Sequence, residues 1–578
     1  MISIKKSISE EILKGVLKIK SDAELDAHTV VSMLEYPPDS KMGDLALPCF
    51  KLSKLLRNSP VRIAQIIAED FSSPAVAKAE AVNGYFNIFL DGEYLASKAV
   101  KETKEKGESF GAPELGAGKT VVLDYSSPNV AKPFHIGHLG TTVIGHSLKK
   151  LHEFAGYRCV GINYLGDWGT QFGKLITAYR KWGNKEDVEA RGIDALVELY
   201  VRINNAISGN EEQGIPADAA LADEARAEFR KMEEGDEENI ALWKWFVEIS
   251  LIEYKKTYNQ LGIEFDSYKG ESFYTDKMPA EVQKLRDMGL LKIDDGASIV
   301  DLEAYGMPPC LILKRDGSTL YPTRDIAAAV YRKKTYDFDK AIYVTSAGQS
   351  LHFAQWFKVV ELMGYDFADK LVHVPYGTVS INGAKLATRT GNVILLKDLF
   401  ATAIEKVAGI MEEKNPNLEN KEKIAEQIGV GAVVFYYLSN NRIRDINFVM
   451  EDALSFDGNT GPYVQYTYAR TCSVLQKGGK YSIDGTLSIT APEEAELAKT
   501  LLRFEETVID AIDSYEPSVI TRYILDVAGA YNRFYHNCSI LGAENEQVRN
   551  TRLALTEATK TVLGNAFELI CLAKTEKV

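Results

Sequence analysis

Short apolar runs alternate with amphipathic stretches between Lys119 and Phe400. The runs have the length and the branched residues of buried strands, and they lie at 120–125, 157–164, 341–345 and 371–375. Strands that alternate with helical stretches indicate a parallel sheet with crossover helices. This part of the chain is therefore predicted to be an α/β domain.

After Leu399 the apolar positions follow a helical period over most of the remaining chain. We expect helices at 401–414, 421–438, 463–475, 493–515 and 519–537. Consecutive helices with almost no intervening strand favour a helical bundle. The C-terminal part is therefore predicted to be all-α.

Residues 1–112 mix helical segments with strand-like stretches such as 82–90, which predicts a small α+β domain that ends in a linker at 107–118. Between 187 and 301 the pattern changes to charged helices, which we interpret as an insertion. Its acidic runs are more typical of a solvated face than of a binding site. The predicted divisions are 1–112, 113–400 with an insertion at about 187–300, a helical connector at 401–455, and 456–578.

Composition limits the class of protein. A chain of 578 residues is too long for one hydrophobic core, so about three domains are expected. Its 46% hydrophobic and 26% charged residues are ordinary globular values, which argues against a disordered or fibrous protein. The formal net charge is −14, so any contact with RNA has to come from local basic patches on a surface that otherwise repels phosphate.

Cysteine spacing and hydropathy indicate a reducing, aqueous compartment. The six cysteines include no C-x-x-C pair, which favours reduced thiols and gives no reason to expect a metal site. The N-terminus has no signal-peptide core. The longest apolar run, at 428–438, is shorter than the roughly 20 residues of a membrane span. We expect a cytoplasmic protein without a membrane partner.

The segment from Ser126 to Leu139 reads SSPNVAKPFHIGHL and is the strongest functional signal in the chain. It places His135, Gly137 and His138 where the strand at 120–125 gives way to a helix. A helix start favours phosphate because its free N–H groups point at the anion, and histidines there can donate to a transferring phosphoryl group. An isolated H-x-G-H would more often be a turn with local hydrogen bonds, so the rest of the chain has to decide.

The same segment resembles the HIGH signature of class I aminoacyl-tRNA synthetases, and its flanking residues resemble the arginyl-tRNA synthetase form. The resemblance implies a Rossmann-like catalytic domain with a helical insertion, an N-terminal domain that touches the tRNA elbow, and an anticodon-binding helical bundle. It also implies ATP as a substrate, bound by Gly137, His135 and His138. Gly140 departs from the family, which usually has arginine there, and so does the C-terminal sequence.

The segment Ala384-Lys-Leu-Ala-Thr-Arg-Thr-Gly-Asn-Val393 resembles the KMSKS loop of the same class. Lys385 matches the first lysine, whereas Thr388 stands where the second is expected. Arginyl-tRNA synthetases that lack the second lysine carry one just before HIGH, at the position of Lys132. The resemblance therefore implies catalytic roles for Lys132, His135, His138 and Lys385, and it also places Lys385 among the ATP-binding residues. A surface lysine is the alternative for Lys132.

Tyr321 and Asp325 lie four residues apart at a predicted helix start, which brings both to one face. A carboxylate there could pair with a guanidinium through two hydrogen bonds, which a lysine cannot reproduce. The alternative is a helix cap and a core aromatic. By resemblance, arginine is bound by Tyr321, Asp325, Gln349, Asn129 and Asp124, and His352 belongs to the ATP site. Asp124 could instead be an ordinary acid at a strand end.

The segment from Asp457 to Arg470 resembles the motif that opens the anticodon-binding domain of the family, with Tyr468 in place of the usual histidine. Aromatic residues at helical spacing are more often core, but exposed ones can stack on unpaired bases. The segment from Ala530 to Asn537 is a second candidate. The residues expected to contact tRNA are Tyr463, Gln465, Tyr466, Arg470, Asn532, Arg533 and His536.

Together these motifs predict an arginine–tRNA ligase. The implied reaction activates arginine with ATP to arginyl-adenylate and transfers the arginyl group to tRNA(Arg). Mg²⁺ is expected with the ATP phosphates rather than in a protein cage, and a monomer is expected. Two alternatives remain at this point: a class I synthetase for another amino acid, and an inactive paralogue that binds RNA.

Overall fold

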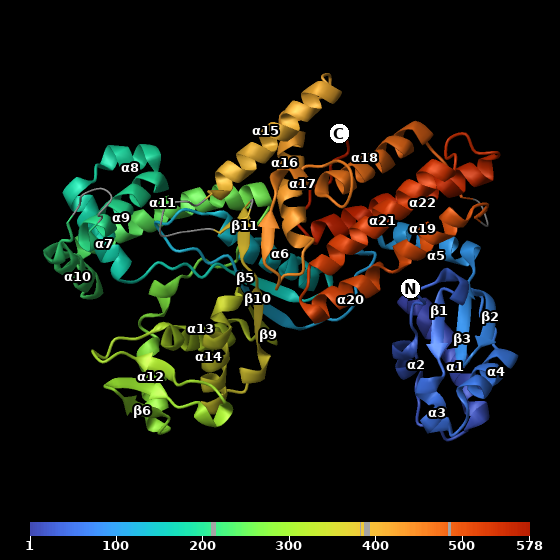
Figure 1. Cartoon of the computed structure of the whole chain (residues 1–578), viewed down its shortest axis with the longest axis horizontal. Coiled ribbons are helices and arrows are strands. Elements are labelled where there is room, and N and C mark those ends of the chain that lie inside the picture. Colours follow the sequence, from blue (N-terminus) through green and yellow to red (C-terminus); the bar gives the residue numbers. More distant parts are fainter. Residues whose placement is uncertain (210–215, 382, 386–393, 484–486, 578) are drawn as a thin grey trace.

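The computed structural model describes residues 1–209, 216–381, 383–385, 394–483 and 487–577 (Figure 1). Residues 386–393 of the KMSKS-like segment, including Thr388, lie outside this set. No helix in the described ranges has both the length and the hydrophobicity needed to cross a membrane.

A four-stranded sheet of order β10-β9-β4-β5 lies at the centre of the molecule, and every pairing in it is parallel. Its strands are β4 (Thr120–Asp124), β5 (Arg158–Ile162), β9 (Lys340–Ser346) and β10 (Leu371–Tyr376), which confirms the four predicted strands. The connecting helices include α6 (Leu139–Phe154), α13 (Tyr321–Tyr336) and α14 (Ser350–Leu362). All five residues of β4 are buried because helices cover both faces, which is why the strand reads as a continuous apolar run.

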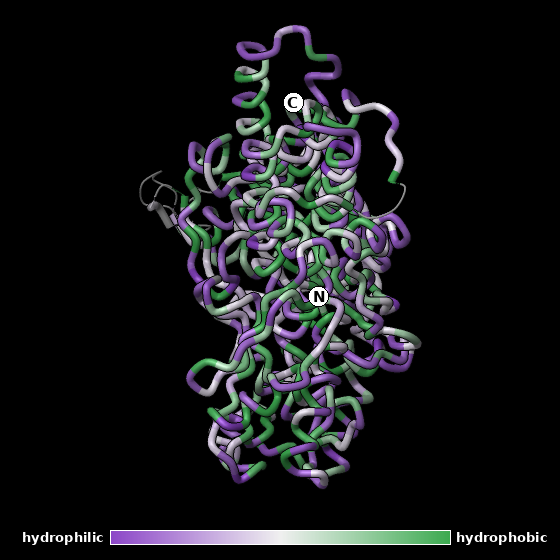
Figure 2. The backbone as a smooth tube through the Cα atoms, turned by 90° about the vertical axis from the view of Figure 1, so that its right-hand side faces the viewer, coloured by the Kyte–Doolittle hydropathy of each residue, from purple (hydrophilic) through white to green (hydrophobic). Residues whose placement is uncertain are grey.

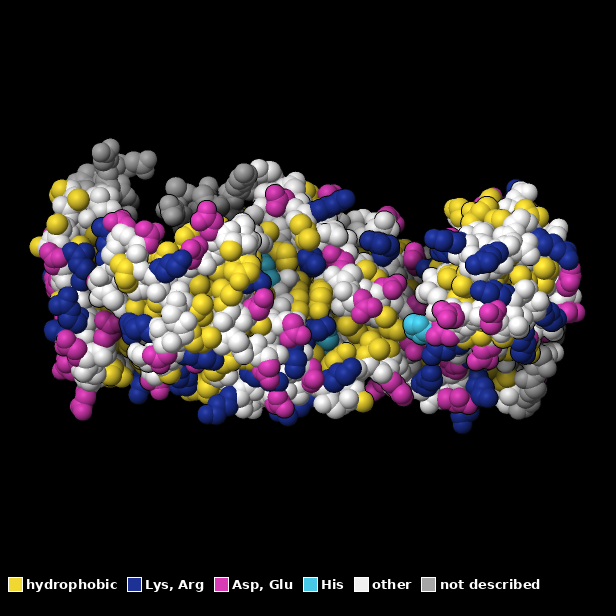
Figure 3. Space-filling model, turned by 90° about the horizontal axis from the view of Figure 1, so that it is seen from below, with side chains coloured by type: hydrophobic (Ala, Val, Ile, Leu, Met, Phe, Trp, Pro, Cys, Tyr) yellow, Lys and Arg dark blue, Asp and Glu magenta, His cyan; other side chains and the backbone are white. Residues whose placement is uncertain are grey.

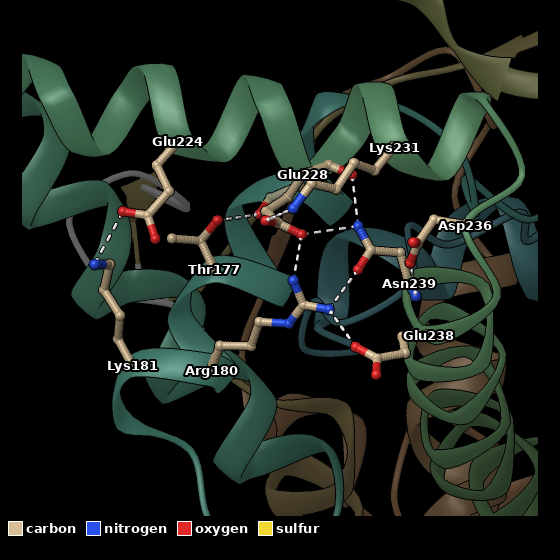
Figure 4. A network of polar contacts seen from close by, with 10 residues as sticks. Thr177, Arg180, Lys181, Glu224, Glu228, Lys231, Asp236, Glu238 and Asn239 are labelled. Atoms are coloured by element: carbon tan, nitrogen blue, oxygen red, sulfur yellow. Dashed lines mark hydrogen bonds and ion pairs between the residues drawn. The ribbon is translucent and has the colours of Figure 1, made fainter.

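The insertion between β5 and β9 begins with the helices α7 (Thr170–Trp182), α8 (Lys185–Arg191), α9 (Ile193–Ser208), α10 (Ala219–Glu233) and α11 (Glu237–Leu261). Arg180 of α7 joins them, since it donates to Glu228 of α10 at 2.6 Å and to Asn239 of α11 at 2.7 Å (Figure 4). The acidic residue Glu228 therefore holds helices together, whereas its neighbours on α10 mostly face solvent.

The end of the insertion differs from the prediction of charged helices. After α12 (Met278–Asp287) the chain forms an antiparallel sheet of β6 (Leu291–Asp294), β7 (Ala297–Val300) and β8 (Cys310–Leu313). The turn between β6 and β7 is Asp295-Gly296, and both residues have positive φ, at 47° and 79°. This is the backbone that a two-residue hairpin requires, and an Asp-Gly pair adopts it readily.

The second half of the chain is mainly helical, as predicted. It contains α15 (Leu396–Lys414), α16 (Lys421–Leu438), α17 (Met450–Ala453), α18 (Gly461–Gly478), α19 (Pro492–Leu502), α20 (Phe504–Ser514), α21 (Ser518–Asn537) and α22 (Glu546–Glu568). The single helix predicted at 493–515 is two helices that meet at Arg503. A small sheet of order β12-β11-β13 interrupts the helices, with β11 (Val379–Ile381), β12 (Ala384–Lys385) and β13 (Ile446–Phe448).

The N-terminal domain has the predicted α+β composition. Its elements are α1 (Ile2–Ile19), α2 (Ala27–Met33), β1 (Leu45–Pro48), α3 (Phe50–Leu56), α4 (Pro60–Glu69), β2 (Val76–Val82), β3 (Tyr85–Leu90) and α5 (Gly92–Lys106). It lies beside the C-terminal bundle and away from the central sheet (Figure 1). The ion pairs Lys5–Glu506 at 3.0 Å and Asp44–Lys499 at 2.8 Å join it to the bundle.

Hydrophobic and hydrophilic residues alternate along most of the chain, as Figure 2 shows. This pattern is expected when each helix or strand turns one face to a core. On the face seen in Figure 3, basic and acidic side chains are interspersed rather than gathered into one large field of either sign. No single large field of one sign is therefore visible on that face.

Candidate functional site

A cavity of about 600 Å³ opens at the carboxyl ends of the central strands. Its lining includes Asp124 at the end of β4, Tyr343 to Ser346 at the end of β9, and Tyr376 at the end of β10. This is the edge at which open parallel sheets bind their ligands. Of the predicted site residues, the cavity is lined by Asp124, Asn129, His138, Tyr321, Asp325, Gln349 and His352.

The HIGH-like segment forms a short 3₁₀ turn, Ile136–His138, directly before α6. The Gly137 N–H donates to His135 Nδ1 at 3.0 Å, and the His135 N–H donates to His138 Nδ1 at 3.2 Å. Because both Nδ1 atoms accept, the proton of each neutral ring is assigned to Nε2, which is left to donate. Burial lowers the pKa of His135 to about 4 and that of His138 to about 3, so both rings are neutral at pH 7.

The loop before this turn is held in an unusual backbone conformation. Ser126, Ser127 and Ala131 have φ of 69°, 46° and 56°, in the left-handed region that non-glycine residues rarely occupy. Buried hydrogen bonds hold it there: Ser126 Oγ lies 2.8 Å from Thr142 Oγ1, and the Ala131 N–H donates to Ser250 Oγ at 3.0 Å. Strain that the surroundings enforce in this way is common at functional sites.

Tyr321 and Asp325 lie on the first turns of α13, as predicted, and both face the cavity. Tyr321 is 65% exposed, whereas the Asp325 carboxylate is partly buried and lies 2.6 Å from His352 Nε2. Asp325 therefore does not cap the helix, whose N-cap residue is Leu320. The structure brings together one residue predicted for arginine and one predicted for ATP.

Glu271, which was not among the predicted site residues, also lines the cavity. Its carboxylate pairs with Arg324 at 2.5 Å, and both side chains are largely buried. Burial raises the pKa of Glu271 to about 7, although Arg324 opposes this shift. No local pattern marks Glu271, because its partner lies more than fifty positions further along the chain.

Asp124 is more than an ordinary acid at a strand end. Its Oδ2 pairs with the Arg332 guanidinium at 2.8 Å, and its Oδ1 accepts from Ser127 Oγ at 2.9 Å. Arg332 is only 1% exposed, and the rings of Tyr164 and Tyr343 lie 5.1 and 5.6 Å from it. Burial raises the pKa of Asp124 despite the nearby guanidinium.

The two lysines that were predicted to be catalytic are placed differently from the other predicted residues. Of the described residues, those lining the cavity include His138 but not Lys132, His135 or Gly137. The Lys132 carbonyl accepts from Tyr254 Oη at 2.8 Å, and burial lowers the pKa of the Lys132 amine. Lys385 lies in β12, where its backbone pairs with Ser380 of β11.

Comparison with known proteins matches three family models to successive parts of the chain. A family model described as the class I (R) tRNA synthetase catalytic domain matches residues 100–450. The arginyl tRNA synthetase N-terminal domain matches residues 3–90, and the DALR anticodon binding domain matches residues 464–578. The chain belongs to the arginyl-tRNA synthetase family.

Relatives and solved structures extend this match over nearly the whole synthetase. An arginine–tRNA ligase of Alkaliphilus metalliredigens is 48% identical over 552 residues, which are 95% of this chain and 96% of the relative. One from Clostridium perfringens is 47% identical over 97% of this chain and 98% of its own length. The Thermus thermophilus arginyl-tRNA synthetase structure has a TM-score of 0.82 at 25% identity and covers 99% of this chain and 100% of its own. The Plasmodium falciparum enzyme, at 23% identity and a TM-score of 0.81 over 100% and 99% of the two chains, supports the fold.

The predicted tRNA residues of the synthetase separate into exposed and internal ones. Tyr466 is 44% exposed, and the Arg470 guanidinium lies 5.0 Å from its ring. Arg470 also lies 4.8 Å from the ring of Tyr535, an exposed residue that was not among the predicted tRNA contacts. Asn532 links Arg470 to Tyr463, because its oxygen accepts from Arg470 and its nitrogen donates to Tyr463 Oη at 2.9 Å. Arg533 and His536 are exposed on α21.

Gln465 does not fit its prediction as a tRNA-contacting residue. It is fully buried, and its amide donates to the Ala573 carbonyl at 3.1 Å and to Thr575 Oγ1 at 3.2 Å. The side chain therefore ties α18 to the C-terminal segment, and in this conformation it cannot reach RNA. Its neighbour Tyr466 points outward because adjacent residues on a helix face different directions.

Gly140 lies at a close contact between two helices. A Cβ atom at this position would lie 2.2 Å from Tyr437 Oη and 3.1 Å from the ring of Tyr376. The start of α6 therefore packs directly against α16. A longer side chain at position 140 would collide with this packing.

Proposed function

We infer that the chain is an arginine–tRNA ligase that uses ATP to form arginyl-adenylate and then transfers the arginyl group to tRNA(Arg). The single observation that carries the site assignment is the shared cavity. His138 of the HIGH-like turn and the Tyr321/Asp325 pair line the same space of about 600 Å³. An amino acid and a nucleotide can therefore meet within it.

The arginine side chain would lie at Tyr321, Asp325 and Glu271. A guanidinium presents its donors as a planar fork that matches a carboxylate, whereas a lysine ammonium is a point charge. Asp325 is held by a histidine rather than by an arginine, so an incoming guanidinium can replace that partner. Glu271 lines the same cavity, where Arg324 holds its carboxyl group.

The α-amino and carboxyl groups of arginine would lie nearer the end of β4. Asn129, Asp124 and Gln349 line the cavity and offer amide and carboxylate groups. Arg332 keeps the Asp124 carboxylate oriented while Asp124 faces the ligand. These contacts would hold the arginine carboxylate for in-line attack on the α-phosphate of ATP, so that positioning supplies much of the rate.

The ATP phosphates would lie over the HIGH-like turn. The neutral rings of His135 and His138 each leave Nε2 to donate, and such donors stabilise charge that develops on a transferring phosphoryl group. Gly137 has no side chain between the two histidines, and His352 lines the cavity beside Asp325. Lys132 and Lys385 would neutralise the leaving pyrophosphate from two sides.

Mg²⁺ would accompany the ATP. In the described part of the chain no group of three or more His, Cys, Asp or Glu side chains could hold a metal. Mg²⁺ binds readily through substrate phosphates and water with few protein ligands. We therefore assign the ion to the nucleotide.

Transfer RNA would contact the exposed face of the helical bundle. Tyr466 and Tyr535 flank the guanidinium of Arg470 and offer surfaces for stacking of unpaired bases, with Arg533 and His536 as neighbours on α21. Asn532 would position Arg470. We also propose that the protein is a cytoplasmic monomer with domains at 1–112, 113–400, 401–455 and 456–578.

Charging of labelled arginine onto total tRNA, beside lysine and glutamine, tests this function. Arginine-only charging is expected, together with ATP–pyrophosphate exchange measured with and without tRNA. Charging of another amino acid would overturn the assignment of the pocket. Neither charging nor exchange, under any condition, would favour an RNA-binding protein without catalysis.

A further inference from the structure

Arg442 joins the catalytic sheet to the C-terminal bundle. It lies in the loop between α16 and β13, and its guanidinium donates to three backbone carbonyls. Nη1 donates to Pro375 at 2.8 Å, Nε donates to Tyr515 at 2.8 Å, and Nη2 donates to Ser514 at 3.4 Å. Pro375 belongs to β10, whereas Ser514 and Tyr515 form the end of α20. One side chain therefore holds a strand end of the sheet against a helix end of the bundle.

The backbone of Arg442 makes the same connection. Its N–H donates to the Glu516 carboxylate at 3.2 Å, and its carbonyl accepts from the Gly377 N–H at 2.8 Å. Glu516 is only 8% exposed. Gly377 is required for this approach, because a Cβ there would lie 2.4 Å from the Arg444 carbonyl. The contact is thus built from both side chain and main chain.

The charge of Arg442 suits its position. Helix α20 ends at Ser514, and its cap residue Tyr515 has a φ of 51°, so the last carbonyls of the helix face the guanidinium. A cation is favoured at the negative end of a helix dipole. An arginine can donate to three carbonyls through its planar fork, whereas a lysine lacks this geometry.

The same loop also holds the strands that carry Lys385. Directly after it, β13 pairs in parallel with β11, and β11 pairs with β12, so that Ser380 lies opposite Lys385. Thr378, just before β11, accepts a hydrogen bond from the Ile446 N–H at 2.8 Å. Tyr376, which lines the cavity, lies between Pro375 and Gly377, both bonded to Arg442. The loop therefore contacts the cavity wall and the Lys385 strands together.

We propose that Arg442 is a positioning residue for the activation of arginine. It sets the strand pair β11–β12, and with it Lys385, at a defined place relative to the cavity and to the helices that would bind tRNA. Arg442 itself touches no substrate. The proposal rests on the proposed role of Lys385 in ATP activation.

The test compares Arg442→Ala and Arg442→Lys with Arg444→Ala, a matched control two residues further on whose side chain is exposed. Adenylate formation is measured by single-turnover kinetics and normalised by active-site titration, so that unfolded protein does not count. Both Arg442 variants should lose tenfold or more in the rate per active site. Their KM for arginine should change less than twofold, and Arg444→Ala should match the wild type.

A role in folding alone would reduce the number of active sites and leave the rate at each site unchanged, which would overturn the proposal. A higher KM for arginine with an unchanged rate would overturn it too, because the defect would then lie in the arginine pocket. If Arg442→Ala does not fold, Glu516→Gln weakens the same junction more mildly and should lower the rate per site at least threefold. An unchanged rate in Glu516→Gln and Arg442→Lys together would also overturn it.

Lys385→Ala separates this proposal from the role on which it rests. If Lys385→Ala keeps the wild-type rate, the assignment of Lys385 fails, and the proposal for Arg442 fails with it. If Lys385→Ala loses activity while the Arg442 variants do not, only the proposal for Arg442 fails. Loss of rate in both, with arginine KM unchanged in the Arg442 variants, supports the proposal.

Discussion

Replacing Asp325 with asparagine removes the negative charge that we assign to arginine recognition and keeps the shape of the side chain. Asp325 lies on α13 at the cavity, and its Oδ2 is 2.6 Å from His352 Nε2. The amide of the substituted side chain still offers one acceptor, so the change removes the charge and one of two acceptors. Its effect should therefore fall on the guanidinium of the substrate.

The expected size follows from the contact that is lost. A hydrogen bond to a charged group contributes about 1.5–3 kcal/mol, and each 1.4 kcal/mol corresponds to about tenfold in affinity. In the free protein Asp325 is already bonded to His352, so binding exchanges one partner for another. We therefore expect the lower half of the range, which is a rise in the KM for arginine of about 10- to 40-fold.

The assay is ATP–pyrophosphate exchange at varied arginine and at varied ATP, with citrulline as an uncharged analogue of arginine. Asp325→Asn should raise the arginine KM, leave the ATP KM within twofold, and weaken the preference for arginine over citrulline. Asp337→Asn is the control, since it makes the same change at the far, exposed end of the same helix. An arginine KM within twofold of the wild type would refute the assignment, and so would an equal rise in the ATP KM.

Three further predictions concern buried charge, packing and RNA contact. Arg332→Met leaves the buried Asp124 carboxylate without its cation and should lower the free energy of unfolding by about 3–5 kcal/mol. Because burial raises the pKa of Asp124, the folded form binds a proton more tightly than the unfolded form, so the melting temperature should fall most at pH 8 and partly recover towards pH 5. Equal losses at both pH values would contradict this. Gly140→Ala brings a methyl group to 2.2 Å from Tyr437 Oη and should lower the free energy of unfolding by about 1–3 kcal/mol in a thermal unfolding experiment. Adding Tyr437→Phe should restore part of this stability. An unchanged stability would show that the two helices can move apart at no cost. If one tRNA base stacks on Tyr466, Tyr466→Ala should weaken tRNA binding about tenfold in a filter-binding titration and leave the melting temperature unchanged. Unchanged tRNA binding would show that Tyr466 does not contact RNA.

The predictable parts of the fold were those encoded in local patterns. The strand at 120–125 was recognisable because a parallel strand covered on both faces is a continuous apolar run. The helix at 421–438 was predicted with the bounds that α16 has, since its apolar positions repeat at the helical period. The break at Arg503 was not predictable, because both flanking helices have the same period. The hairpin at 291–300 carried an Asp-Gly signal that the charge pattern obscured.

The candidate site likewise contains residues that local sequence patterns indicate and residues that only the folded structure reveals. The HIGH-like segment placed His135 and His138 correctly at a strand-to-helix junction, because the geometry of such a junction is local. Glu271 was missed since its contacts join segments far apart in the sequence. Gln465 was assigned to RNA although it is buried. A sequence motif does not show which way each side chain on its helix points.

The order of residues alone thus established the family, the parallel sheet, the helical bundle and the chemical groups available for ATP and arginine. These features depend on spacing along the chain, which short-range sterics and hydrogen bonding convert into helices and strands. Folding decided which charges face each other. The pairs Asp124–Arg332, Asp325–His352 and Glu271–Arg324 form only when the sheet brings distant segments together, and burial then changes the proton affinity of Asp124 and Glu271. Folding also put Arg442 between the sheet and the bundle, because its three acceptors lie in segments that meet only in the packed molecule.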